Sequence, residues 1–209
     1  MINITYAITV CNELEEVTKL VDFLQNRIHN EDEILIQYDS DSATQSVTDY
    51  LRIISQMHKS IRVISFPLNN DFASYKNNLK NHANGIFIFQ IDADELPSEY
   101  LMENIHEFLE YNKDVDLFFV PRINTVDGLT KDHIKKWRWQ VNDKGWVNFP
   151  DYQTRLYRRT SEIEWVGKVH ERIVGYNTLS PLPAEEQYCL YHHKQIERQE
   201  KQNAYYDTI

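Results

Sequence analysis

Short apolar runs alternate with amphipathic segments along the first half of the chain. Each run is about as long as one β-strand and is rich in β-branched and aromatic residues, which predicts strands. The runs are Ile4–Val10, Glu33–Asp39, Ile61–Phe66 and residues 85–92. Between them, apolar residues recur every three or four positions, which predicts helices. The best examples are Val17, Leu20, Val21, Leu24 and Ile28, followed by Val47, Leu51, Ile54 and His58.

Polar residues mark the starts of these helices. Asn12 with Glu15 three residues later has the spacing of a capping box. Asp71 can cap a helix that extends to about Ala83, and Ser98 can cap one that extends to about Tyr111. Strand and helix therefore alternate four times with short connections, which predicts a mostly parallel sheet with helices on both faces.

Three of the predicted strands end in polar residues. These ends are Asn12–Glu13, Asp39–Ser40–Asp41 and Asp92–Ala93–Asp94–Glu95. The carboxyl ends of parallel strands meet at one edge of the sheet, where α/β proteins bind their ligands. We therefore expect these side chains to converge on one crevice.

The pattern changes in the second half of the chain. We expect a strand over Val115–Ile123, two antiparallel strands over residues 153–159 and 168–176, and a last strand near Gln187–His192. Residues 124–150 show little periodicity, and Lys194–Ile209 is typical of a polar terminal helix. No repeat or linker is evident, so we predict one α/β domain over residues 1–209. It would have two functional halves, residues 1–95 and residues 96–209.

Composition narrows the classes of function. The net charge of −10 disfavours nucleic-acid binding, although a local cationic pocket or a metal ion could still hold one phosphorylated ligand. No apolar run approaches the ~20 residues that span a bilayer, so any membrane association is expected to be peripheral. The first ten residues lack the features of a signal peptide, and Cys11 and Cys189 lie in apolar settings. We therefore expect free thiols and a cytoplasmic protein.

The acids after the fourth strand have two interpretations. Asp92, Asp94 and Glu95 can form a solvated turn that caps the next helix. Alternatively, Asp92 and Asp94 are two residues apart and can point the same way in an extended segment. Such a pair can bind Mg²⁺ or Mn²⁺, leaving open positions for a diphosphate.

An ordered set of segments resembles one known family. The strand end "IDADE" follows "NNDFASYKNNLKNHANG", and "RLYRR" and "WVGKVHERI" come later. From Ile4 to about Arg198 the chain is similar to glycosyltransferases of family 2 with the GT-A fold. The resemblance implies a GT-A domain with a small antiparallel acceptor-side sheet and a C-terminal helix. It implies that residues 1–95 form the half that binds the nucleotide-sugar and that residues 96–209 form the acceptor half. It also implies a metal-dependent inverting transferase that moves a sugar from a nucleotide-sugar, with UDP-sugars favoured, to a hydroxyl of a glycan or lipid-linked acceptor.

The resemblance also implies roles for individual residues. The nucleotide-sugar would be bound by Thr9, Cys11, Glu13, Asp39, Asp41, Lys76, Asn77 and Asp92. Lys76 stands where the family usually has arginine, beside Asn77 and near the diphosphate. The metal, Mn²⁺ or Mg²⁺, would be bound by Asp94, with Asp92 nearer the ribose or a metal-bound water. His192 matches a late histidine that serves as an extra metal ligand, and His193 is the alternative.

The catalytic base should come from the acceptor half, because metal and diphosphate cover the leaving side. Glu171 is the candidate, with His170 as a positioning residue or as the base itself. In an extended segment these two side chains would point to opposite faces. A third interpretation is an ion pair of Glu171 with Arg172 or Lys168. Spacing also puts Arg155 and Arg158 on opposite strand faces, so at most one should reach the site, and surface pairing is favoured for each.

The acceptor side is expected among the aromatic residues Trp137, Trp139 and Trp146. Sugars stack on aromatic rings, but a small second core fits these residues equally well. If Trp137 and Trp139 lie on one strand, they share a face, which favours packing for at least one. Two other functions stay open. One is a binding module that kept the nucleotide crevice and lost turnover, and the other is a nucleotidyltransferase. The latter would need an early Gly-rich loop, which "TVCNELEE" lacks.

Overall fold

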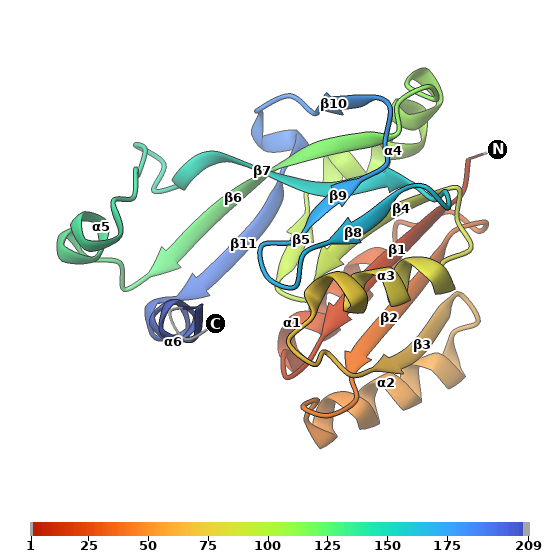
Figure 1. Ribbon diagram of the computed structural model, residues 1–209, viewed down its shortest axis with the longest axis horizontal. Helices are drawn as coiled ribbons and strands as arrows, with labels where there is room; N and C mark the ends of the chain where they lie inside the picture. Colours follow the sequence, from red (N-terminus) through yellow and green to blue (C-terminus); the bar gives the residue numbers. More distant parts are fainter. Residues whose placement is uncertain (1, 207–209) are drawn as a thin grey trace.

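The computed structural model describes residues 2–206, with side chains described through residue 201, and a twisted sheet forms its centre (Figure 1). The strands lie in the order β3-β2-β1-β4-β7-β6-β11-β5, and β10 pairs with β6. In the first half the strands are β1 (Ile4–Val10), β2 (Glu33–Asp39), β3 (Ile61–Phe66) and β4 (Phe87–Asp92). These four are parallel, since β1 pairs with β2 and β4, and β2 pairs with β3. The predicted mostly parallel α/β sheet is confirmed.

Four helices connect or follow these strands: α1 (Leu14–Gln25), α2 (Gln45–Met57), α3 (Phe72–His82) and α4 (Glu99–Tyr111). The predicted caps of α3 and α4 are confirmed, because Asp71 accepts from Ser74 N and Ser98 accepts from Leu101 N. The predicted capping box of α1 is wrong. The N-cap of α1 is Glu13, whose carboxylate accepts hydrogen bonds from the backbone N–H groups of Cys11 and Asn12.

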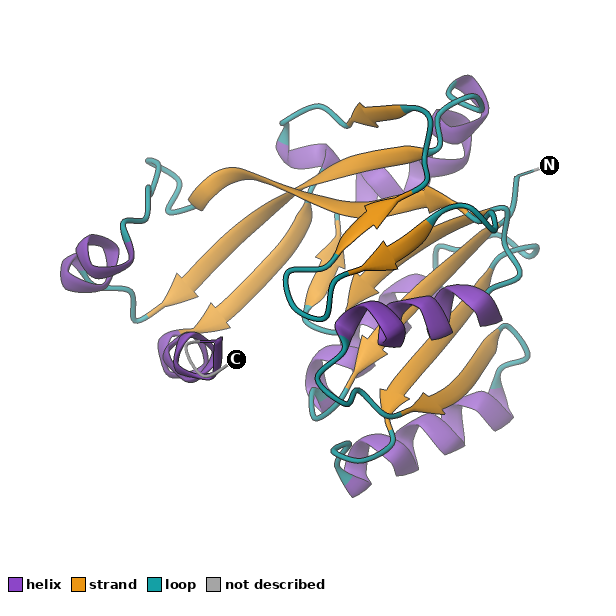
Figure 2. Cartoon of the chain, in the orientation of Figure 1, coloured by secondary structure: helices purple, strands orange, loops and turns teal. Residues whose placement is uncertain are grey.

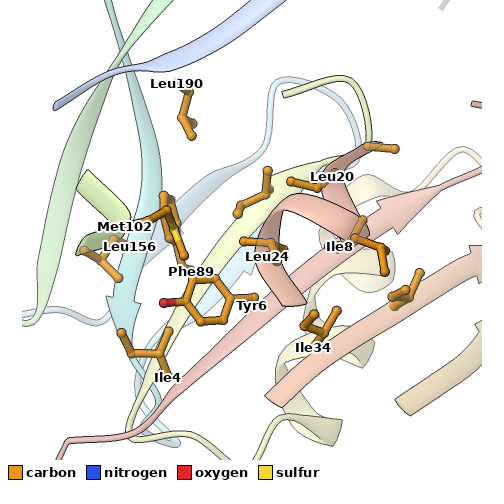
Figure 3. Close-up of a cluster of buried hydrophobic side chains, with 14 of the residues drawn as sticks. Ile4, Tyr6, Ile8, Leu20, Leu24, Ile34, Phe89, Met102, Leu156 and Leu190 are labelled. Atoms are coloured by element: carbon orange, nitrogen blue, oxygen red, sulfur yellow. The ribbon is translucent and has the colours of Figure 1, made fainter. Parts of the chain in front are cut away.

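Two hydrophobic layers hold the helices against the sheet. One layer, on the face covered by α1, α2 and α4, includes Tyr6, Leu20, Leu24, Phe89 and Met102 (Figure 3). The other layer joins α3 to the opposite face (Figure 2). Complete burial of one such side chain stabilises the fold by about 1.5–3 kcal/mol. The positions of β1, β2 and β4 are therefore fixed from both sides.

The second half adds longer strands to the same sheet. They are β5 (Glu95–Pro97), β6 (Leu117–Asp127), β7 (Val147–Arg158), β10 (Leu179–Pro181) and β11 (Leu190–Gln195). Strand β7 lies between β4 and β6 and is antiparallel to both, whereas β11 is parallel to β6. A short 3₁₀ helix, η1, covers Glu186–Tyr188, where a strand had been predicted to begin.

A separate two-stranded antiparallel sheet, β8 (Glu164–Val166) with β9 (Arg172–Val174), packs on the α3 side of the molecule (Figure 1). The small antiparallel sheet is thus confirmed, but the strand predicted over 168–176 is wrong in extent. Residues 167–171 form a loop, in which Gly167 has φ +95° and His170 has φ +54°. These two turns pull the chain out of the extended conformation.

Helix α5 (Lys131–Trp137) lies in the region that showed little periodicity. Thr130 caps it with a capping box, and it ends at Arg138 in the left-handed conformation. Trp137 and Trp139 therefore do not share a strand face, which corrects that expectation. The C-terminal helix α6 (Ile196–Tyr206) is confirmed, and residues 207–209 of the predicted helix lie outside the described residues.

Neither cysteine forms a disulfide in the described chain, since Cys11 and Cys189 are both free. Within the described residues, every helix is too short or too polar to cross a membrane.

Candidate functional site

The polar ends of the parallel strands meet at one cavity of about 610 Å³. Thr9, Cys11 and Glu13 reach it from the end of β1, and Asp39 reaches it from the end of β2. Asp92 and Asp94 reach it from the end of β4. Parallel register places these groups together, because Thr9 of β1 lies opposite Asp92 of β4. We call this side of the cavity the strand wall.

The rest of the cavity comes from separate elements. Lys76 comes from α3, Arg155 from β7, and His170 and Glu171 from the loop between β8 and β9. His192 of β11, Lys194 of β11 and Arg198 of α6 complete this side, which we call the facing wall. His170 and Glu171 both line the cavity, because the loop is not extended. The expectation that they point to opposite faces is therefore wrong.

Two arginines, the buried Arg155 and the half-buried Arg122, compensate the acids after β4. Arg155, only 4% exposed, donates to Asp92 and, at 2.6 Å, to Glu95 Oε1. Arg122 donates to the same oxygen of Glu95 at 2.7 Å and to Asp151. Buried charges are tolerated when they are paired and hydrogen-bonded in this way. The acids are therefore an internal ion network, and the alternative of a solvated turn is wrong.

The charge of Asp92 is firmly held. Burial alone would raise the pKa of the Asp92 carboxyl, but the charges of Arg155 and Lys76 outweigh it and keep that pKa well below its usual value. Thr9 Oγ1 also donates to Asp92 Oδ1 at 3.0 Å. Both carboxylate oxygens of Asp92 thus accept hydrogen bonds from protein groups, which leaves Asp94 as the acid with more freedom to bind a ligand.

Asp94 lies beside an imidazole in the same cavity. His192 Nε2 is 3.4 Å from Asp94 Oδ2, and Arg198 Nη2 is 3.2 Å from that oxygen. Burial opposes ionisation of Asp94, but the hydrogen bond and charge of His192 bring its pKa below the ordinary value. His192 Nδ1 is 2.8 Å from Asn124 Oδ1, which fixes the orientation of the ring.

The donor set around Asp94 fits a divalent cation only in part. Among the described residues, no group of three or more His, Cys, Asp or Glu side chains is arranged to hold a metal ion. Asp94 and His192 supply one carboxylate and one imidazole, which suits an ion that takes its other ligands from phosphate and water. His193 points elsewhere, to Asp127, on the exposed side of β11.

Lys76 and Glu171 form an ion pair across the cavity. Both side chains are largely buried, and the Lys76 ammonium also lies 4.3 Å from the centre of the Trp165 ring. Asn77 holds Trp165 in place through both backbone groups of that residue, at 2.8 and 2.9 Å. Glu171 therefore pairs with Lys76, whereas the sequence pointed to Arg172 or Lys168 as ion-pair partners.

Of the other residues predicted to bind the nucleotide-sugar, some line the cavity and some do not. Asp39 Oδ1 accepts hydrogen bonds from the backbone N–H groups of Asp41 and Leu68, so its loop is held in place. Burial and the nearby acids raise the pKa of the Cys11 thiol, which keeps Cys11 neutral. Asp41 and Asn77 lie outside the lining of the cavity. Asp41 is exposed, and Asn77 supports Trp165.

The three tryptophans lie beyond the main cavity. Trp137 and Trp139 have ring centres 4.7 Å apart, and Trp146 packs on Phe149 at 4.8 Å. Trp139 alone of the three lines a smaller pocket of about 200 Å³, which shares Arg122, His192 and Lys194 with the main cavity. The aromatic residues thus pack on one another, and one of them borders the site.

Sequence reasoning missed most of the basic residues of the site. The sequence favoured surface pairing for Arg155 and gave no prediction for Arg122, Lys194 and Arg198. As the spacing of the two residues predicts, Arg155 lies in the cavity, whereas Arg158 pairs with Asp116 elsewhere. A usable signal was Arg122 itself, because a charged residue within the apolar run "LFFVPRI" needs a buried partner.

Comparison with known proteins identifies related sequences and folds. The sequence profile of the family described as "Glycosyl transferase family 2" matches residues 5–175. No curated protein sequence matches the chain.

Several solved structures share its architecture. S. aureus TarS 1–349 superposes with a TM-score of 0.62 at 15% identity, over 92% of this chain and 60% of that one. The same TarS fragment in complex with UDP gives a TM-score of 0.63 at 13% identity, over 92% and 60%. Its complex with UDP-GlcNAc gives 0.61 at 16% identity, over 93% and 59%. This chain therefore spans about 60% of the length of those TarS chains, and the likeness shows a GT-A fold.

Proposed function

The chain belongs to glycosyl transferase family 2, and from that premise we propose that it transfers a sugar from a nucleotide-sugar to an acceptor hydroxyl. One observation carries this proposal. Carboxylates at the carboxyl ends of β1 and β4 share a cavity with Lys76 and with the carboxylate of Glu171. An anionic donor and a general base are needed at the same place, and this cavity offers groups for both.

The donor would lie along the strand wall. Asp39 has one carboxylate oxygen fixed by two backbone N–H groups, so its other oxygen is oriented for an N–H donor of a nucleobase. Thr9, Cys11 and Glu13 would border the base and ribose. TarS of the same fold has been crystallised with UDP and with UDP-GlcNAc, which supports a UDP-sugar as the donor.

A divalent cation, Mn²⁺ or Mg²⁺, would be held by Asp94 and His192. When bound, such an ion offsets negative charge on the leaving diphosphate. Imidazole is a better ligand for Mn²⁺ than for Mg²⁺, which favours manganese. Asp92 would act beside the metal rather than on it, because Thr9 and Arg155 already occupy its oxygens.

The transfer step places the remaining residues in roles. The acceptor oxygen attacks the anomeric carbon as the bond from that carbon to the diphosphate oxygen breaks, and the diphosphate leaves with the bonding electrons. The acceptor proton passes to the Glu171 carboxylate, with His170 beside it as the alternative base or as a positioning residue. Attack opposite the leaving group inverts the anomeric configuration.

The acceptor would be a glycan or a lipid-linked saccharide. It would approach from the facing wall, since the strand wall is taken by the donor. Trp139 borders the smaller pocket that adjoins the site, and a sugar ring can stack on it. Trp137 would support that platform through its ring contact with Trp139, whereas Trp146 packs on Phe149.

A donor panel tests the proposal directly. The protein is incubated with UDP-, GDP- and dTDP-sugars and candidate acceptors, with and without Mn²⁺, and release of free nucleoside diphosphate is measured. We expect release from one donor class and a strong dependence on the ion. Tight UDP binding without any release would instead favour a binding module that has lost turnover. If no nucleotide binds at all, the proposed function is wrong.

A further inference from the structure

Lys76 differs from the three arginines of the cavity in how many acids hold it. Arg155 pairs with two carboxylates, Arg122 pairs with two, and Arg198 pairs with three. Among the described residues Lys76 forms an ion pair with one, Glu171. An arriving anion would therefore displace fewer protein contacts at Lys76 than at any of the three arginines.

The surroundings of Lys76 would let its ammonium change partners. The Trp165 ring stabilises the positive charge through its face, at 4.3 Å, without taking part in the ion pair. Asp92 of the strand wall lines the same cavity as Lys76. The ammonium is thus paired with the candidate base Glu171 inside the cavity that a diphosphate would enter.

The loop that carries Glu171 is anchored apart from this ion pair. Phe72 N, in the first turn of α3, donates to Lys168 O at 3.0 Å. This bond keeps the loop against α3 whether or not the Glu171 side chain is paired. Glu171 could therefore leave Lys76 by side-chain rotation, without movement of the loop.

We propose that Lys76 is exchanged between Glu171 and the diphosphate of the donor, so that donor binding releases the base. This inference rests on the proposed function. Before the donor arrives, Glu171 is held by the ammonium and is a weaker proton acceptor. Once the diphosphate takes the ammonium, the Glu171 carboxylate is free to accept the proton of the acceptor hydroxyl. The donor must then bind before the acceptor can be activated.

The proposed exchange predicts an effect on nucleotide binding that a purely catalytic role of Glu171 does not predict. If Glu171 competes with the diphosphate for Lys76, removing its charge should tighten nucleotide binding. We expect Glu171→Gln to lower the Kd for UDP by roughly fivefold to tenfold, the lower range of coupling between two sites. A residue that acts only as a base would leave the Kd for UDP unchanged, and a residue with a structural role would raise it.

A double-mutant cycle measures the coupling. UDP and GDP are titrated calorimetrically into the wild type, Glu171→Gln, Lys76→Met and the double variant, with and without Mn²⁺. We expect Lys76→Met to weaken binding and Glu171→Gln to have no effect in the Lys76→Met background. Lys76→Arg keeps the charge and should retain the gain from Glu171→Gln. Glu164→Gln, on the exposed start of β8, removes the same charge from the same hairpin and should leave binding unchanged.

The outcomes separate the two proposals. Tighter binding in Glu171→Gln that disappears without Lys76 supports the exchange. Unchanged or weaker binding in Glu171→Gln overturns it, and so does equal tightening in Glu164→Gln, while the proposed function stands in either case. If the wild type binds neither UDP nor GDP and releases no nucleoside diphosphate from any donor of the panel, the proposed function fails and the exchange fails with it.

Discussion

The two walls of the cavity are built by different forces. The strand wall stands on β1, β2 and β4, which pair with one another and are buried between two hydrophobic layers. The facing wall gathers side chains from α3, β7, β11, α6 and one loop, and ion pairs hold it in place. Lys76 pairs with Glu171 within this wall. Arg155 pairs with Asp92, and Arg198 with Glu13 and Asp94, so these two arginines join it to the strand wall.

Because of this difference, the strand wall can position a ligand, whereas the facing wall can rearrange when a charged ligand binds. Apolar packing is insensitive to the charge of a ligand, so the strand wall keeps its shape when a nucleotide arrives. An ion pair across a cavity competes directly with a charged ligand, so the facing wall can rearrange. The groups assigned to the base and ribose are on the first wall, whereas Glu171 and the cations that would meet the diphosphate are on the second.

The sharpest test of this division is Glu171→Gln. The amide keeps the shape of the side chain but cannot accept a proton from the acceptor. We expect turnover to fall by roughly 10²–10⁴-fold, the usual size of a lost general base. Nucleotide affinity should not weaken, because the strand wall is untouched. Turnover is measured as nucleoside diphosphate release with the productive donor, and unchanged turnover would move the base to another residue, with His170 tested next.

Removal of the Arg155 charge tests whether ion pairs hold the two walls together. Arg155→Met keeps the stem of the side chain but leaves Asp92 without its buried partner and Glu95 with Arg122 alone. Breaking such a pair typically lowers the free energy of unfolding by about 3–5 kcal/mol. Urea denaturation provides the measurement.

Arg158→Met is the matched control for that experiment. It lies three residues further along β7 and pairs with Asp116 in a more exposed place. This pair is half-buried and closer to water than Arg155, so we expect a smaller loss of about 1 kcal/mol. Equal losses of unfolding free energy in the two variants would show that the Arg155–Asp92 pair contributes no more to stability than the Arg158–Asp116 pair.

The same division explains what could be predicted from the sequence. The bounds of β1, β2 and β3 follow from local apolar runs, and the meeting of Thr9, Asp39 and Asp92 follows from parallel register. Each of these results depends on residues that are close in sequence or on a general rule of α/β sheets.

The facing wall could not be predicted in this way. Arg155 meets Glu95 over 60 positions and Lys76 meets Glu171 over 95, and neither separation leaves a periodic signal. The loop that carries Glu171 departs from a strand through the positive φ of Gly167 and His170, and a histidine seldom adopts that conformation. Helix α5 was missed because its seven residues, "KDHIKKW", bury no apolar face.

A smaller effect is expected at the metal side. Asp94→Asn removes one of the two protein ligands proposed for the cation, and loss of a group that supports a metal typically costs about 10–100-fold in affinity. We expect the increase in UDP affinity that Mn²⁺ produces to shrink by that factor, measured by titration with and without the ion.

Asp127→Asn is a close control for Asp94→Asn. Asp127 pairs with His193 on the exposed side of β11, just as Asp94 lies beside His192 on the buried side. The control variant should bind UDP and Mn²⁺ like the wild type. If Asp127→Asn reproduces the loss and Asp94→Asn does not, the neighbouring histidine, His193, is the metal ligand.

The smallest effect concerns the far end of the ion network. Asp151 accepts hydrogen bonds from Arg122 and Asn124. Burial raises the pKa of the Asp151 carboxyl, but the charge of Arg122 outweighs burial and lowers that pKa below its usual value. A carboxyl whose pKa is lowered by folding adds stability above its unfolded pKa, about 3.9 for aspartate. That contribution disappears as the pH falls through the folded pKa.

Asp151→Asn should therefore destabilise the protein at neutral pH by about 1–2 kcal/mol, since hydrogen bonds to a charged group are exchanged for weaker ones. Below about pH 4 the unfolded chain binds a proton at Asp151 before the folded chain does, so the wild type loses this contribution as the pH falls toward the lower folded pKa, and the difference between the two proteins should narrow. Urea denaturation at pH 7 and pH 3 measures both values. A difference that stays constant with pH would mean that Asp151 acts through its shape, and the facing wall would then depend less on charge than its ion pairs imply.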